Sequence, residues 1–218
     1  LADALPIGDY AATVQFTNTT DHVGDTLRQV TLRVGSNDLC ANATVACPGT
    51  YTDSTVGMTN DGSASCGNSG TSPDVWYKYK PATSGTLDLL LCDSGYDTVL
   101  SVHTGCPGTS SNQLACNDDS GWFGACGIFP TDQSALTDIS VTAGQTYYIR
   151  IAGAGGATGT YVLDLSGPAC APFTGACCYA DGSCAVLAEA DCTAGDGLYW
   201  GDGTTCSPSP CPAADCTR

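Results

Sequence analysis

Alternating apolar and polar residues predict β-strands over most of the chain. Turn clusters such as Asn60-Asp61-Gly62 and Thr83-Ser84-Gly85 separate the strand-like runs. The runs are Gly49–Val56, Val75–Lys80, Thr86–Cys92, Thr98–His103, Gln113–Cys116, Leu136–Val141, Thr146–Ala152 and Thr160–Leu165. Runs repeated roughly every 8–12 residues are typical of a sandwich. Residues 37–167 are therefore predicted to form one antiparallel β-sandwich or jelly-roll-like domain, and the fold class is all-β.

The first 36 residues predict one β-hairpin with a single apolar face. Two runs alternate with a period of two, one over residues 10–16 and one over 27–34. The apolar positions proposed for assembly are Tyr10, Val14, Phe16, Val30, Leu32 and Val34. A two-stranded hairpin with one apolar face is at best marginal alone in water. We expect upstream strands, the rest of the chain or another copy to cover that face.

Residues 168–218 predict a small unit stapled by disulfides. Eight of the 15 cysteines fall in this stretch, with Asp-Gly turns at 181–182 and 202–203. Only Val186–Asp191 has even a brief helical pattern. So short a segment cannot bury enough apolar surface to be stable without cross-links.

The charge of the chain argues against two classes of partner. Six Lys and Arg residues face 22 acidic residues, which gives a net charge of −16. Nucleic acids and anionic membranes both attract basic surfaces, so neither is an expected partner. No apolar run approaches the roughly 20 residues of a membrane span. The start of the chain has neither an initiator Met nor a signal peptide, so we expect a mature fragment or a segment of a longer secreted polypeptide.

The cysteines indicate an oxidising compartment. Only His22 and His103 accompany them, so disulfides are favoured over metal thiolates and the protein is predicted to be secreted or on the cell surface. Local spacing favours the pairs Cys40–Cys47 and Cys106–Cys116. Six cysteines are expected to pair within the C-terminal unit, namely Cys177, Cys178, Cys184, Cys192, Cys206 and Cys211. Cys216 is then left over, for an intermolecular bridge, a partner further downstream or a free thiol.

Aspartates at predicted strand ends make calcium the candidate cofactor. Because hard cations bind six to eight oxygens, side chains that converge from neighbouring strands are candidate ligands. The strands at 98–103 and 113–116 should be neighbours. The candidate ligands are Asp93, Asp97, Asn117, Asp118 and Asp119, with Asn37 and Asp38 as a second set. The alternative is a polar loop whose side chains bond the local backbone.

No motif predicts an enzyme. His22 and His103 have no Gly-x-Ser-x-Gly elbow near them, and any carboxylate pair drawn from 21 aspartates would be arbitrary. We therefore predict no catalytic residues.

Three aromatic residues are candidates for contact with a ligand or partner, although aromatic residues on strands are usually core. Trp76 aligns with Lys78 and Lys80 on the expected wetter face, and Trp122 and Phe123 fall in a loop. Asn18 and Asn42 begin glycosylation-type triplets.

Five short sequence motifs resemble the bacterial pre-peptidase C-terminal domain. They lie at 37–40, 74–77, 96–100, 116–119 and 144–151 and include Asp74-Val75-Trp76-Tyr77 and Cys116-Asn117-Asp118-Asp119. The hairpin resembles the last two strands of an immunoglobulin-like repeat, and the segment beginning Gly175-Ala176-Cys177-Cys178 resembles a small cysteine-rich module. The resemblance implies a non-catalytic, sometimes calcium-dependent sandwich that is fused to hydrolases or surface proteins.

Two functions fit these features. The first is an extracellular structural protein, a subunit or repeat of a surface fibre, pilus-like filament or surface layer, assembled by strand complementation with other copies or with adjacent domains of a longer chain. The second is a non-catalytic accessory module of a large secreted hydrolase, which binds polysaccharide or a matrix protein, with glycans as candidate partners. The two functions are distinguished by where the apolar side chains of the hairpin are buried, since packing within their own chain would exclude strand exchange. These residues are Tyr10, Val14, Phe16, Val30 and Leu32.

Overall fold

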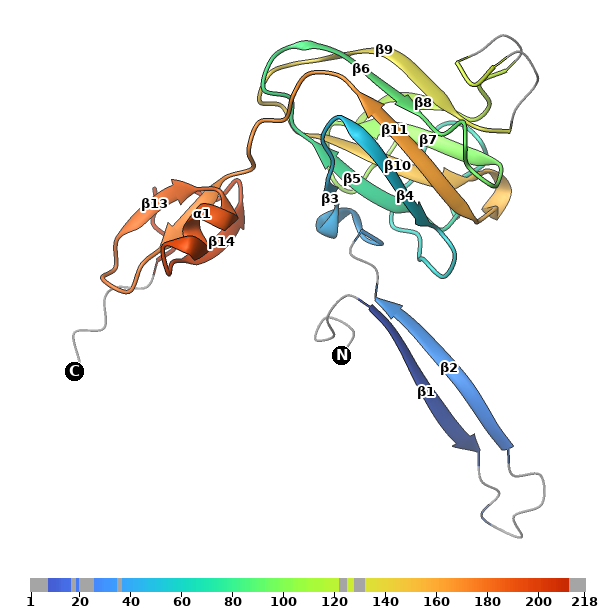
Figure 1. The fold of residues 1–218 in the computed structure, drawn as a ribbon, viewed down its shortest axis with the longest axis horizontal. Coiled ribbons are helices and arrows are strands. Elements are labelled where there is room, and N and C mark those ends of the chain that lie inside the picture. Colours follow the sequence, from blue (N-terminus) through green and yellow to red (C-terminus); the bar gives the residue numbers. More distant parts are fainter. Residues whose placement is uncertain are drawn as a thin grey trace. The chain divides into compact units, whose positions relative to one another are not determined.

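The computed structural model shows a chain of two compact units, residues 1–169 and 170–218 (Figure 1). It describes residues 8–16, 19, 26–34, 37–121, 125–127 and 132–211; within the strands of the hairpin it describes the backbone and, of the side chains, only that of Thr13. Strands dominate both units, and the sheets are antiparallel apart from one short parallel pair. The fold is thus all-β, as the sequence predicts.

The core of the first unit is a sandwich of two sheets (Figure 1). One sheet has the order β3 (Thr44–Val45), β5 (Val75–Tyr79), β10 (Tyr147–Gly153), β7 (Thr98–His103) and β8 (Gln113–Asn117). The other has the order β4 (Gly49–Ser54), β11 (Thr160–Ser166), β6 (Gly85–Leu90) and β9 (Ala135–Val141). Short 3-10 turns lie at η2 (Cys40–Asn42) and η3 (Ala154–Gly156). All eight predicted runs are strands, whereas the two-residue β3 gave no pattern long enough to predict.

Alternation along the strands builds the core between the sheets. Tyr77 of β5 and Tyr161 of β11 are buried, and their hydroxyl oxygens lie 2.8 Å apart across the two sheets. The other buried apolar side chains include Val75, Tyr79, Leu87, Leu89, Leu100, Val102, Ile149, Ile151, Leu163 and Leu165. Burying a contiguous set of this kind provides the main driving force for folding.

The opposite face of the five-stranded sheet is also buried, which makes the predicted exposure of Trp76 wrong. Arg150 pairs with Trp76 across β10 and β5, and both side chains are fully buried. Arg150 donates to the carboxylate of Asp74, and Trp76 Nε1 donates to Asp61 Oδ1 at 2.6 Å. The segment around Asp61 covers this face, so alternation with Lys78 did not identify the solvent side.

Both disulfides predicted from local spacing are also wrong. The structure joins Cys40 to Cys106, across 66 residues, and Cys66 to Cys116, across 50. Cys116 pairs with Ser101 three residues into β8, away from the loop that contains Cys106. Cys92 bonds to Cys126, and Cys47 is also in a disulfide. Close spacing in sequence therefore favoured the wrong partners, because each of these bonds joins segments that are far apart in the sequence.

The hairpin forms as predicted and is its own two-stranded sheet. β1 (Gly8–Phe16) pairs with β2 (Thr26–Val34) along nine residues. The register sets Tyr10 opposite Leu32 and Ala12 opposite Val30, so the two predicted apolar rows fall on one face of the ribbon. Among the described strands, each pairs only with the other.

The C-terminal unit is a three-stranded sheet with one short helix (Figure 1). β12 (Gly175–Cys178) lies between β13 (Cys184–Leu187) and β14 (Leu198–Asp202), and α1 is Glu189–Ala194. The helix expected at Val186–Asp191 thus begins later, because Val186 belongs to β13. The six cysteines pair internally, as predicted, in the bonds Cys177–Cys192, Cys178–Cys211 and Cys184–Cys206. Cys170, at the start of this unit, is also in a disulfide.

Candidate functional site

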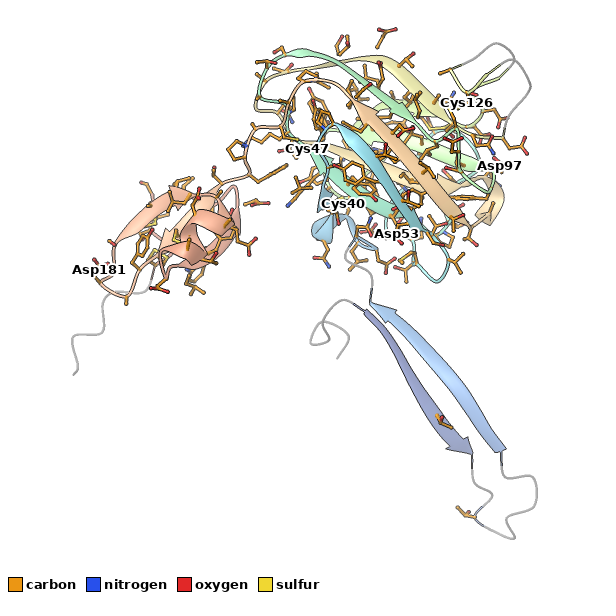
Figure 2. All side chains as sticks on the ribbon, viewed as in Figure 1. Cys40, Cys47, Asp53, Asp97, Cys126 and Asp181 are labelled. Atoms are coloured by element: carbon orange, nitrogen blue, oxygen red, sulfur yellow. A yellow bond between two sulfur atoms is a disulfide. The ribbon has the colours of Figure 1, made fainter. Side chains whose placement is uncertain are left out.

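Three of the predicted calcium ligands converge at one end of the sandwich. Asp97 immediately precedes β7, while Asp118 and Asp119 immediately follow β8 (Figure 2). β7 and β8 are antiparallel neighbours, so the start of one lies beside the end of the other. One carboxylate oxygen from each residue lies within 4.8 Å of the other two. The prediction that these strands are neighbours is confirmed.

The charges in this cluster are poorly compensated within the described structure. Asp97 Oδ1 and Asp118 Oδ1 are buried and have no hydrogen-bond partner among the described residues. Burial raises the pKa of Asp97, and the carboxylates of Asp118, Asp119 and Asp132 raise this pKa further. Burial and Asp119 likewise raise the pKa of Asp118. Carboxylates that repel each other and lack donors form a site suited to a cation.

The covalent frame around the cluster fixes its position. The disulfide Cys66–Cys116 joins the residue before Gly67 to a residue near the end of β8. A Cβ on Gly67 would lie 2.7 Å from Asp118 Oδ1 and 2.2 Å from Val99 Cγ2, so only glycine fits there. Gly67 also has a φ of +67°, which glycine adopts without strain. The Asp118 carbonyl accepts a hydrogen bond from Ser134 Oγ at 2.7 Å. The cluster is therefore held by a closed loop rather than by a free chain.

The other predicted calcium ligands do not join this group. Asp93 is exposed and outside the three-carboxylate cluster. Asn117 is occupied in the fold, since its Oδ1 accepts from Ala135 N at 2.9 Å and its Nδ2 donates to the Asp119 carbonyl. Both predictions came from nearness in sequence, which did not determine where the side chains point.

The second predicted set, Asn37 and Asp38, is part of the frame of the sandwich. Asp38 accepts from the backbone N and the hydroxyl of Thr59, at 2.6 and 3.0 Å. Asn37 is buried, and its backbone carbonyl accepts a hydrogen bond from the backbone N of Trp76 at 2.8 Å. The Oδ1 of Asn37 is buried without a partner among the described residues. Asp38 is not part of the three-carboxylate cluster of the described residues.

A second cluster of metal-ligand type is explained by disulfides. The sulfur atoms of Cys178, Cys184 and Cys211 lie within 4.8 Å of one another. Cys178 is bonded to Cys211 and Cys184 to Cys206. Metals bind the thiolate, so these oxidised sulfurs are structural cross-links.

One buried array has the residue types of a catalytic triad. His103 Nε2 lies 2.8 Å from Ser101 Oγ, and its Nδ1 lies 3.1 Å from Asn112 Oδ1. Ser101 and His103 are fully buried, and a Cβ on Gly108 would lie 2.8 Å from the His103 ring. Burial also lowers the pKa of His103. The array packs the β7–β8 loop against the sheet, and no substrate could reach its hydroxyl.

Several predicted residues lie outside the described part of the chain. These are Trp122, Phe123, Asn18, His22 and Cys216. Asn42 is exposed in η2, and its glycosylation stays a prediction. Trp200, which the sequence did not single out, is 44% exposed on β14. Its alternation with Leu198 was the signal that could have identified it.

Comparison with known proteins adds one structural likeness. No protein-family model and no curated protein matches the sequence. A pre-peptidase C-terminal domain of collagenase from Bacillus anthracis is similar at 15% identity, over 57% of this chain and 94% of that chain, with a TM-score of 0.37. A superposition this loose carries no conclusion about function. In the described part of the chain, no helix is both long enough and apolar enough to cross a membrane.

Proposed function

We propose that the protein is a non-catalytic extracellular structural protein that assembles through its N-terminal hairpin. One observation carries this proposal: β1 and β2 form a separate sheet in which, among the described strands, each pairs only with the other. Both outer edges of the ribbon therefore have backbone donors and acceptors available for a further strand. Strand addition would satisfy these backbone groups and extend the face to which the register assigns Tyr10 and Leu32.

The arrangement of donor and acceptor decides what such pairing builds. The hairpin of one copy can pair with a different surface on the next copy. The growing assembly then always has one unpaired hairpin at one end and one unpaired acceptor surface at the other. A head-to-tail contact of this kind does not close unless its rotation completes a ring, so it grows into a filament. The disulfides in both units fit an oxidising, extracellular setting for that filament.

Electron microscopy of the native, non-reduced protein tests the proposal. We expect regular filaments from the intact chain and dispersed particles from a variant with Leu32→Asp and Val30→Asp. A control variant, Thr13→Ser, changes an exposed residue on the other face of the ribbon and should assemble normally. Dispersed monomers from the intact chain, with calcium present, would overturn the fibre function and favour an accessory module that binds polysaccharide or matrix protein.

We further propose that Asp97, Asp118 and Asp119 bind calcium. Two buried carboxylate oxygens that have no hydrogen-bond donor among the described residues support the site, because a divalent ion would compensate the charge that burial leaves there. Three carboxylates supply part of the six to eight oxygens that calcium binds, and water or backbone carbonyls complete the shell. The ion would join the start of β7 to the end of β8 and so stiffen this end of the sandwich.

Thermal unfolding with calcium and with a chelator tests this site. A ligand at about 100 times its Kd adds about 2.7 kcal/mol to the stability of the folded state. We expect a rise of this order for the intact chain and none for Asp118→Asn. Asp138→Asn is the matched control, because Asp138 is exposed on β9 at a positive φ that asparagine tolerates. Equal stabilisation of all three proteins would show that calcium acts elsewhere.

A further inference from the structure

An edge strand of the C-terminal unit exposes two large apolar side chains. Leu198 is 62% exposed and Trp200 is 44% exposed, and both are on β14. β14 lies at the edge of its sheet and pairs only with β12 among the described strands (Figure 1). A bulge follows Trp200, where Gly201 has a φ of +97° and its carbonyl packs closely against Gly175. An edge strand with exposed apolar side chains is suited to pairing with another strand.

The surroundings of this edge are acidic. From 170 to 211 the sequence has no Lys or Arg, and its carboxylates are Asp181, Glu189, Asp191, Asp196 and Asp202. Glu189 and Asp202 act electrostatically on Tyr199 of β14, and the Tyr199 hydroxyl donates to Asp202 Oδ1 at 2.6 Å. A strand that pairs here would therefore be favoured by positive charge as well as by apolar side chains.

The hairpin of the same protein has both properties. Of the six Lys and Arg residues in the chain, Arg28 and Arg33 are on β2, which has no acidic residue. The register places Arg28, Val30 and Leu32 on one face of the ribbon and Arg33, opposite Asp9, on the other face. One outer edge of β2 is open among the described strands. β2 thus combines a free edge, an apolar row and basic residues.

We propose that β14 of one copy accepts β2 of a second copy by strand addition. In the extended sheet Leu198 and Trp200 lie beside the apolar row of the incoming ribbon, and the carboxylates around β14 attract its arginines. The inference rests on the proposed assembly function and names the acceptor surface for it. Because donor and acceptor are different parts of the chain, each added copy presents a fresh acceptor.

Photo-cross-linking in the full-length chain tests the acceptor directly. Trp200 is replaced by p-benzoylphenylalanine, and this protein is mixed with ¹⁵N-labelled wild-type chain before irradiation. We expect cross-linked peptides that join unlabelled residue 200 to labelled residues 26–34. Cross-links only within one chain, cross-links only to other surfaces, or no cross-links between chains would each overturn the proposal.

Matched variants separate this inference from the proposed function. Leu198→Ser with Trp200→Ser should raise the protein concentration needed for assembly at least about tenfold. Val186→Ser is the control, because Val186 is 49% exposed on β13 at the opposite edge of the same sheet. Unchanged assembly of the β14 variant, with loss of assembly in the Val30→Asp and Leu32→Asp variant, would refute β14 as acceptor and keep the assembly function. Absence of assembly in the intact chain would refute both.

Discussion

The sandwich and the C-terminal unit reach a folded state by different means. In the sandwich, whole strands such as β7 are buried along their length, and the core extends through both sheets. In the described part of the C-terminal unit, the buried apolar residues are Ala176, Cys177, Cys178 and Cys192. Three of these four are disulfide cysteines. The small unit therefore has cross-links at the positions where the sandwich has a core.

The contrast follows from the length of each unit. A chain of about 130 residues can bury most of its apolar surface, whereas one of about 40 residues usually needs disulfides, a metal or a partner. The same limit explains why β14 can leave Leu198 and Trp200 exposed. Because disulfides stabilise the small unit, its large apolar side chains do not all have to be buried in a core. These exposed side chains are the ones that the strand addition proposed above would use.

The most complete loss of structure is expected when one cross-link is removed from the small unit. Cys177→Ala with Cys192→Ala deletes a bond that spans 15 residues, which costs about 3 kcal/mol in the chain-entropy account. We expect residues 170–211 to unfold while the sandwich stays folded, as measured by hydrogen exchange resolved to peptides. The control pair Cys92→Ala with Cys126→Ala should lower the melting temperature of the sandwich without unfolding it at 25 °C. Equal loss of protection in both units would contradict the contrast.

A second test breaks the buried ion pair of the sandwich. Arg150→Met leaves Asp74 buried without its partner, which typically costs 3–5 kcal/mol. Urea unfolding monitored by tryptophan fluorescence should show this loss, because Trp76 lies beside the pair. Lys80→Met removes a charge elsewhere on the sandwich and serves as the control. A loss below about 1 kcal/mol for Arg150→Met would mean that solvent reaches Asp74.

A third test adds one methyl group at the carboxylate cluster. Gly67→Ala places a Cβ against Val99 and Asp118 at a positive φ, and overpacking of this kind costs about 1–3 kcal/mol. We expect a lower melting temperature and weaker calcium binding, both measured by calorimetry. Gly70→Ala is the control, since nothing lies within 4 Å of its added Cβ. Identical calcium affinities for the two variants would show that the space at Gly67 does not affect calcium binding.

The smallest expected effect is a pH dependence. Burial raises the pKa of Asp74 to about 6, with Arg150 opposing the rise. The folded state then holds this proton more tightly than the unfolded state, so the contribution of Asp74 to stability grows as the pH falls through 6. Between pH 7 and pH 5 the gain is about 1 kcal/mol. The stability difference between wild type and Asp74→Asn, measured at both pH values, should move by this amount; a shift of opposite sign would contradict it.

The sequence predicted strands well and long-range partners poorly. Period-two alternation located β4 to β11, because every second residue of these strands faces the core between the two sheets. It misplaced Trp76 because the second face of that sheet is covered by a loop, which alternation cannot register. The proximity of Asp97 and Asp118 could be predicted, because the start of one antiparallel strand lies beside the end of its neighbour. Asp93 could not be excluded, because the direction of a side chain in a turn depends on backbone angles that the sequence does not specify.

The disulfide beside the carboxylate cluster makes the geometry of this site depend on oxidation of the chain. Cys66–Cys116 holds Gly67 next to Asp118, so the geometry of the site depends on an oxidised bond. In a reducing compartment that bond is absent, and the segment that holds Gly67 is no longer tied to the strand that leads to Asp118 and Asp119. For the calcium site proposed above, the arrangement of ligands would therefore be complete only after this bond has been oxidised.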